Sequence, residues 1–157
     1  MIKAIIGLGN EGKEYVGTYH NVGTYAVHLY EHKEANRPIR FFEPTGFMNA
    51  IGDPITQFLK NQPVSSEEML IIHDDSDLLI GSYKLSFGGG SAGHKGVQSV
   101  IDSLGTDAFW RLRVGIRDPK EQVRQKAGDF VLKKISKAEE VLVASALEKV
   151  WPEILKI

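Results

Sequence analysis

The chain has 157 residues, of which 42% are hydrophobic and 25% are charged, a composition typical of one folded domain with a full hydrophobic core. It contains no cysteine, which excludes disulfide bonds, thiolate metal sites and a cysteine nucleophile. The formal net charge of −1 argues neither for nor against a nucleic-acid partner.

The N-terminal segment starts with an apolar run over residues 2–8, which predicts a buried strand. This start does not have the pattern of a signal peptide, and no apolar run is long enough to span a bilayer. We therefore expect one cytoplasmic domain over residues 1–157, with no contact to a membrane.

The glycine-rich segment 7–12, Gly-Leu-Gly-Asn-Glu-Gly, superficially matches the dinucleotide-binding fingerprint. In that fingerprint a helix starts at once and an acidic residue follows about 20 positions later. Here a second breaker-rich stretch continues to Gly17, and no such acidic residue completes the unit. We interpret the segment as a tight loop that places Asn10 at the end of a strand.

A histidine stands at the centre of the next segment, Gly17-Thr18-Tyr19-His20-Asn21-Val22-Gly23. The flanking glycines let the backbone approach a ligand, and the neighbouring side chains can hydrogen-bond the imidazole. A neutral histidine is well suited to take a proton near neutral pH. We hypothesise that His20 performs chemistry, although this motif alone is also compatible with a surface or capping histidine.

Helical spacing of apolar residues predicts a helix over residues 22–33. His28 and His32 are four residues apart but lack the carboxylate of the zinc-protease pattern, so we interpret both as surface residues. A strand is expected at residues 39–42, a loop at 44–49 and a helix at 54–60.

A second apolar strand is predicted at residues 69–73, and Asp74, Asp75 and Asp77 follow it. Ligands of open α/β sheets bind at such carboxyl ends of strands. Residues 82–87 predict a further strand. The glycine-rich run 88–96 contains His94 and Lys95, and we expect it to cap a site and to lead into a helix over 97–104. A strand at 110–116 and an amphipathic helix at 138–154 complete the chain.

Charge is unevenly distributed along the chain. Residues 65–80 carry only acidic charges, whereas lysine and arginine dominate residues 111–137. One region could hold a polyanion while the other tunes a catalytic group. Both are equally compatible with ordinary solvated surface.

Six short blocks together resemble one family, the bacterial peptidyl-tRNA hydrolases, from residue 2 to about residue 132. They occur in the family's order: Gly7-Leu8-Gly9-Asn10 with Gly12; Thr18 and His20-Asn21 with Gly23; Phe47-Met48-Asn49 with Gly52; His73-Asp74-Asp75 with Asp77-Leu78 and Gly81; Gly88-Gly89-Gly90 with Gly93-His94 and Gly96; and Arg111-Leu112-Arg113-Val114-Gly115-Ile116.

This resemblance implies an α/β fold: a single-domain, three-layer α/β/α sandwich around a mixed, mostly parallel twisted sheet. It further implies a monomeric hydrolase that acts without a metal or cofactor. Such an enzyme cleaves the ester between a peptide and the 3′-terminal ribose of tRNA, and so recycles tRNA from stalled translation. The partner would be the acceptor end of peptidyl-tRNA.

The resemblance also assigns roles to individual residues. His20 is the catalytic base, and Asp74 is the catalytic carboxylate that holds its other ring nitrogen. The substrate-binding residues it implies are Asn10 near the terminal nucleotide, Asn49 near the ester carbonyl, Met48 as an apolar wall, His94 at the rim of the cleft, Arg113 on acceptor-end phosphates, and Tyr15 and Lys95 as further contacts. No serine or threonine stands in a nucleophile elbow, which favours direct attack by water.

Several positions depart from the family pattern. Glu11 stands where proline is usual, Tyr19 where arginine is usual, Lys95 where asparagine is usual, and Ser86 where a second phosphate-binding lysine is often found. The segment between Leu29 and Phe41 is shorter than usual. Two hypotheses follow: an active hydrolase with a trimmed edge, or a hydrolase-like protein that binds tRNA or another RNA without cleaving it. Retention of His20 together with Asp74 favours the hydrolase.

Overall fold

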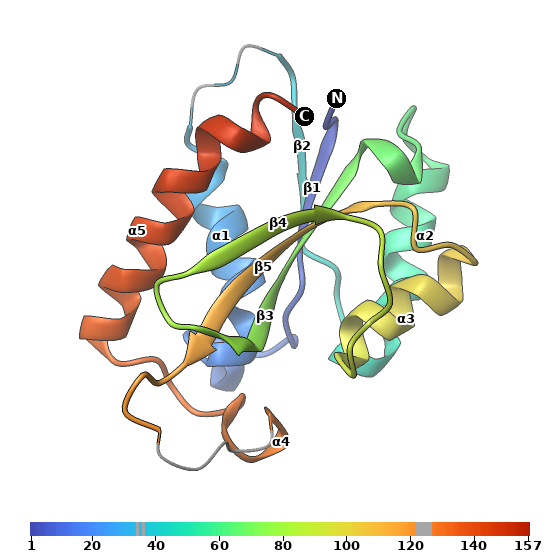
Figure 1. Ribbon diagram of the computed structural model, residues 1–157. Helices are drawn as coiled ribbons and strands as arrows, with labels where there is room; N and C mark the ends of the chain where they lie inside the picture. The colour runs from blue at the N-terminus through green and yellow to red at the C-terminus, as the bar shows by residue number, and fades with distance from the viewer. Residues whose placement is uncertain (34, 36, 122–126) are drawn as a thin grey trace.

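Five strands form one mixed sheet in the computed structural model, which describes residues 1–33, 35, 37–121 and 127–157 (Figure 1). The strand order is β2-β1-β3-β5-β4. Four strands run parallel and β4 pairs antiparallel with β5. The bounds are β1 Ala4–Gly7, β2 Arg40–Phe42, β3 Met69–Leu79, β4 Tyr83–Phe87 and β5 Trp110–Arg117.

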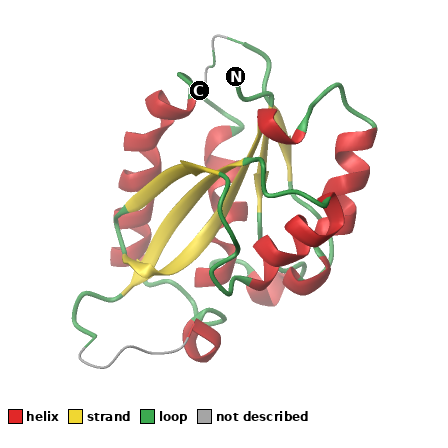
Figure 2. Cartoon of the chain, turned by 45° about the vertical axis from the view of Figure 1, so that its right-hand side comes forward, coloured by secondary structure: helices red, strands yellow, loops and turns green. Residues whose placement is uncertain are grey.

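Helices cover both faces of this sheet, so that the molecule has three layers (Figures 1 and 2). Helices α1 (Val22–Tyr30) and α5 (Lys137–Ile154) lie on one face. Helices α2 (Gly52–Lys60) and α3 (Lys95–Leu104) lie on the other, and the short α4 (Ala127–Phe130) lies beyond the end of the sheet. The α/β/α architecture and the mixed, mostly parallel sheet expected from the sequence are confirmed.

Strand β3 divides the hydrophobic core into two clusters because neighbouring side chains of a strand point to opposite faces. Leu70 and Ile72 pack in the cluster beneath α1 and α5. Met69 and Ile71 pack in the cluster beneath α2 and α3. All four side chains are fully buried, so the middle of the sheet is rigidly fixed between the two helix layers.

Close contact between α1 and the sheet depends on Gly23. A Cβ atom there would lie 2.3 Å from the carbonyl oxygen of Ile72 and 2.6 Å from the nitrogen of Leu8. Only glycine permits this approach. The first turn of α1, and His20 just before it, are thereby held against the carboxyl ends of β1 and β3.

Each of the four predicted helices differs from the structure at one end; α3 begins two residues and α5 one residue before the predicted start. The first helix ends at Tyr30 rather than at residue 33, so His32 lies in the following turn. His28 forms an exposed ion pair with Glu43, consistent with its interpretation as a surface residue. Helix α2 begins at Gly52, two residues before the predicted start.

The larger difference concerns β3, which was expected to end at residue 73 but continues to Leu79 through the acidic residues. The pairing with β5 shifts register between Asp75 and Leu79, as at a β-bulge. The Asp75 carboxylate accepts a hydrogen bond from the Asp77 backbone nitrogen at 2.7 Å, which satisfies that donor inside the irregularity.

Two stretches considered in the sequence, the shortened segment between Leu29 and Phe41 and the basic stretch 111–137, include positions that the structure does not describe. Residues 34 and 36 of the shortened segment lie outside the described residues, as do Arg124 and Lys126 of the basic stretch. No helix in the described part of the chain is both long and apolar enough to cross a bilayer.

Candidate active site

A cleft of about 380 Å³ opens where β1 and β3 end. In the strand order, the chain leaves β1 toward one edge of the sheet and later returns beside it as β3, so this is the switch point where ligands of open α/β sheets bind. Most of the polar side chains singled out from the sequence line it: Asn10, His20, Asn49, Asp74, His94, Lys95 and Arg113. Met48 also lines it.

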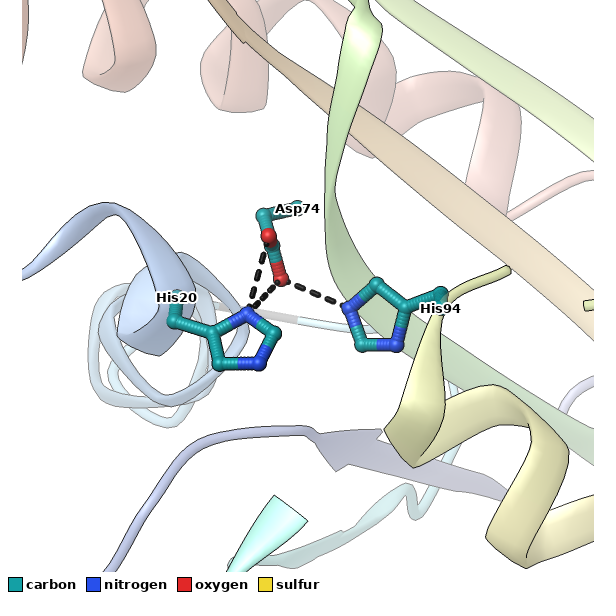
Figure 3. Close-up of side chains that lie close together, drawn as sticks. All are labelled: His20, Asp74 and His94. Carbon is teal, nitrogen blue, oxygen red and sulfur yellow. Dashed lines mark hydrogen bonds and ion pairs between the residues drawn. The ribbon is translucent and has the colours of Figure 1, made fainter. Parts of the chain in front are cut away.

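His20 lies in the short 3-10 helix Tyr19–Asn21 that precedes α1. Its ring Nδ1 lies 2.9 Å from each carboxylate oxygen of Asp74 (Figure 3). An ionised carboxylate can only accept hydrogen bonds, so Nδ1 carries the proton and Nε2 keeps a lone pair. Figure 3 shows Nε2 on the side of the ring away from Asp74. His20 is therefore arranged as a general base.

His94 approaches the same carboxylate from the opposite side, with Nε2 2.7 Å from Asp74 Oδ1 (Figure 3). Its Nδ1 accepts hydrogen bonds from the backbone nitrogens of Gly96 and Val97, at 3.1 and 3.2 Å, and so caps the N-terminus of α3. Since Nδ1 is the acceptor, the ring proton is on Nε2, where it is donated to Asp74. The helix start thus fixes the tautomer of His94.

Asp74 is almost completely buried, with 4% of its side chain exposed. Burial alone would raise the pKa of its carboxyl group, but the charge and hydrogen-bond interactions with His94 and His20 outweigh burial and lower the pKa well below its usual range. Asp74 therefore stays ionised at neutral pH and can stabilise a positive charge on His20.

His73 lies beneath this cluster and was not assigned a role from the sequence, although it was part of a matching block. Its Nδ1 donates a hydrogen bond to the backbone oxygen of Asp74 at 2.8 Å, and its ring packs edge-on to His94 with centroids 4.7 Å apart. Its Nε2 has no hydrogen-bond partner within the described residues. Desolvation lowers the pKa of His73 to about 3, so the ring is neutral.

Among the described residues, His20, Asp74 and His94 are also the one group whose candidate ligand atoms are close enough to hold a metal ion, within 4.8 Å of one another. The hydrogen bonds argue against that use. Because Nδ1 of His94 caps α3, Nε2 holds the proton and has no lone pair to offer a metal. The three side chains form a hydrogen-bonded chain rather than a ligand set.

The amide side chains expected to bind substrate occupy a second wall of the cleft. Asn10 Oδ1 accepts a hydrogen bond from the Met48 backbone nitrogen at 2.8 Å, which identifies its other terminal atom as the NH2 donor. Asn49 lies exposed in the short 3-10 helix Met48–Ala50, and Met48 is buried as an apolar wall. Tyr15 is not among the lining residues, but its ring packs edge-on against Phe47, which is.

The basic residues near the cleft differ in how far their side chains are already hydrogen-bonded within the protein. Arg113 lines the cleft while its Nε donates to Asp75 Oδ2 at 2.5 Å. Arg111, the first residue of the basic stretch 111–137, is buried and donates to the backbone oxygens of Gly88 and Gly90. It holds the glycine-rich loop that carries His94. Lys95 is exposed at the start of α3, and no ion pair of its side chain occurs within the described ranges.

A third wall, missed from the sequence, comes from Gly128, Val131 and Leu132. The backbone nitrogen of His20 donates to the Val131 oxygen at 2.8 Å. Beside it, the Tyr19 hydroxyl donates to Glu139 Oε2 at 2.6 Å. This wall lacks polar motif residues, so nothing in the pattern pointed to it.

The three-layer α/β/α sandwich and the His20–Asp74 pair in its cleft together define a hydrolase. Residues 4–156 match the family model described as peptidyl-tRNA hydrolase, and the chain belongs to the peptidyl-tRNA hydrolase family. A peptidyl-tRNA hydrolase of Aquifex aeolicus (strain VF5) is 33% identical over an alignment of 166 positions, which covers 94% of this chain and 85% of the relative. That of Ruthia magnifica is 38% identical over 88% of this chain and 81% of the relative.

Solved structures support the same conclusion. The crystal structure of peptidyl-tRNA hydrolase from Acinetobacter baumannii superposes with a TM-score of 0.82 at 30% identity, covering 98% of this chain and 86% of the other. The [NiFe] hydrogenase maturation protease HybD of Thermococcus kodakarensis reaches a TM-score of 0.54 at 17% identity, which indicates a shared fold only.

Proposed function

We propose that this chain hydrolyses the ester bond between the peptide and the 3′-terminal ribose of peptidyl-tRNA, and so returns tRNA from stalled translation. The observation that carries the proposal is the pairing of His20 Nδ1 with Asp74 at 2.9 Å, inside the cleft of a family member. We propose that the enzyme acts as a monomeric, single-domain protein over residues 1–157, in the cytoplasm, and without a metal or cofactor.

In the proposed reaction, His20 Nε2 removes a proton from water while the water oxygen attacks the ester carbonyl carbon. The carbonyl electron pair moves onto the oxygen and forms a tetrahedral oxyanion. When this intermediate collapses, the bond to the ribose oxygen breaks, and that oxygen receives the proton from His20. The products are a peptide carboxylic acid and a tRNA with a free hydroxyl group.

Asp74 supports both halves of this cycle. It keeps the proton of His20 on Nδ1, which leaves Nε2 free, and its negative charge stabilises the imidazolium that forms. His94 and the α3 N-terminus keep Asp74 in place through a hydrogen bond at 2.7 Å. We therefore assign His94 to the support of Asp74 in addition to its expected position at the rim.

The oxyanion requires hydrogen-bond donors, and amide side chains supply them. Asn49 is the proposed donor near the ester carbonyl, and the NH2 group of Asn10 is the proposed contact to the terminal nucleotide. Met48 supplies an apolar surface between them, and Tyr15 supports the mouth of the cleft through Phe47.

Acceptor-end recognition is proposed to rest on Arg113 and Lys95. Cations that contact phosphates give affinity with little sequence readout, as an enzyme that serves many tRNAs requires. Arg113 is oriented for such a contact by Asp75.

The alternative function is an RNA-binding protein without turnover, and Lys95 and Tyr19 are the departures that motivate it. Incubation of the purified protein with peptidyl-tRNA, followed by separation of products, tests the proposal. We expect free tRNA and a peptide acid in equal amounts, with no peptide attached to the protein at any time. Intact peptidyl-tRNA in a stable complex would support the alternative instead.

A further inference from the structure

Asn21 follows His20 directly and takes no part in the proposed reaction. It is 5% exposed and ends the short 3-10 helix that carries His20, immediately before α1. A buried carboxamide is costly unless both its oxygen and its NH2 group find partners. The partners that Asn21 uses are therefore informative.

Both ends of the Asn21 side chain bind the backbone of one residue, Asn10. The Asn10 backbone nitrogen donates to Asn21 Oδ1 at 2.9 Å, and Asn21 Nδ2 donates to the Asn10 backbone oxygen at 2.9 Å. The carboxamide therefore pairs with Asn10 as a neighbouring strand would. A Cβ atom on Gly9 would lie 3.0 Å from the Asn21 carboxamide, so the close approach also uses the glycine at that position.

The Asn10 side chain is fixed as a consequence. Its backbone is held on both sides by Asn21, and its Oδ1 accepts the Met48 backbone nitrogen at 2.8 Å. With the oxygen occupied by Met48, the NH2 group is left as the donor toward the cleft that Asn10 lines. One segment thus carries both His20, the proposed base, and Asn21, whose side chain holds the backbone of Asn10.

We propose that Asn21 is a positioning residue that acts through Asn10: it holds the Asn10 carboxamide at a fixed place relative to His20, so that the bound 3′ end of the tRNA is aligned with the base. This inference rests on the proposed function. It predicts that Asn21 has an effect on catalysis only while the Asn10 side chain is present.

A double-mutant cycle tests this dependence. We would measure kcat and KM on peptidyl-tRNA for the wild type, Asn21→Ala, Asn10→Ala and the double variant. Loss of alignment by a fraction of an ångström can cost about 10-fold or more in kcat/KM, and we expect a loss of that size for Asn21→Ala alone. In the Asn10→Ala background the same substitution should change kcat/KM by less than about 2-fold, because contacting residues are not additive.

The pH profile of kcat/KM should keep its shape in Asn21→Ala, because within the described residues both hydrogen bonds of the Asn21 side chain go to Asn10 rather than to His20 or Asp74. Additive losses in the cycle, or a changed pH profile, would overturn the inference. Asn61→Ala, the same change at an exposed position beyond α2, should have no effect.

Two further measurements keep the test decisive. If Asn21→Ala lowers the folded fraction, Asn21→Asp keeps the acceptor for the Asn10 nitrogen but replaces the donor to the Asn10 oxygen with a charged carboxylate oxygen. Its loss of kcat/KM should likewise be smaller in the Asn10→Ala background. If the wild type does not hydrolyse peptidyl-tRNA, the proposed function fails. The cycle is then measured on Kd for tRNA, where additive effects would still overturn the role of Asn21.

Discussion

The carboxylate of Asp74 accepts a hydrogen bond from His94 Nε2 at 2.7 Å, on the same side chain that faces His20. One buried carboxylate therefore accepts hydrogen bonds from two histidines, whose remaining ring nitrogens differ in what they contact. His20 retains a free lone pair toward the cleft, whereas both nitrogens of His94 are occupied, one by Asp74 and one by the start of α3.

Replacement of the shared carboxylate should affect chemistry far more than binding. In Asp74→Asn the amide can donate to His20 Nδ1 and so favour the wrong tautomer, with the proton on Nε2. We expect kcat to fall by about 10²–10⁴-fold, the range of general-base contributions, with little change in Kd for tRNA. Single-turnover rates and binding titrations check this. The control is Asp102→Asn, on the exposed side of α3. If the kinetics of Asp74→Asn were unchanged, Asp74 would have no part in the mechanism.

Two substitutions separate the two duties of His94. Asn is a good N-cap residue, so His94→Asn should keep the α3 cap while losing the donor to Asp74; we expect a decrease in kcat of about 10-fold and little change in Tm. His94→Leu loses both, and should in addition lose about 1 kcal/mol of stability. Thermal unfolding beside steady-state kinetics checks both variants. Wild-type kcat in His94→Asn would show that the cap is its whole contribution.

Acid stability should depend on His73. Its pKa is lowered to about 3 in the folded protein by desolvation, while an unfolded histidine titrates near 6.5. Between these values the unfolded chain binds a proton that the folded chain does not, so stability falls as pH decreases below about 6.5, by at most about 1.4 kcal/mol per pH unit.

The variant that isolates this effect is His73→Asn, which keeps a side-chain donor but cannot titrate. Its Tm should fall less than that of the wild type between pH 7 and pH 5, whereas His32→Asn at an exposed position should behave like the wild type. Parallel Tm curves for His73→Asn and the wild type would contradict the account.

Lys95 offers a test of the tRNA side of the cleft. If its ammonium contacts a phosphate, Lys95→Asn should lower kcat/KM at low salt and reduce the slope of log kcat/KM against log salt by about 0.7–0.9. Lys60→Asn, on the exposed end of α2 and outside the cleft, should leave the slope unchanged. An unchanged slope with a higher kcat in Lys95→Asn would mean that the lysine impedes turnover rather than binding substrate.

The sequence predicted the sheet and most of the polar side chains that line the cleft, because apolar runs and motif order are local properties of the chain. Asp74 was expected beside His20 from the resemblance, although they are 54 residues apart. The predicted end of β3 at residue 73 was wrong. The strand continues through acidic residues because Asp75 accepts a hydrogen bond from the Asp77 nitrogen and pairs with Arg113.

Other features depend on contacts that residue types do not encode. A basic stretch is usually solvated surface, but Arg111 is buried because it donates hydrogen bonds to the carbonyl groups of the glycine-rich loop. Asn21 was part of a matching block, yet its role emerges only when Gly9 brings the Asn10 backbone to its side chain. The tautomer of His94 likewise follows from where α3 begins.

The central claim is that His20 activates water in a working hydrolase. Single-turnover hydrolysis of peptidyl-tRNA by wild type and His20→Ala, with tRNA binding measured for both, tests it most directly. We predict that the wild type cleaves its substrate, and that His20→Ala binds tRNA equally well but cleaves at least about 10²-fold more slowly. Equal rates in the two proteins, whether both fast or both absent with salt-sensitive binding retained, would contradict the account.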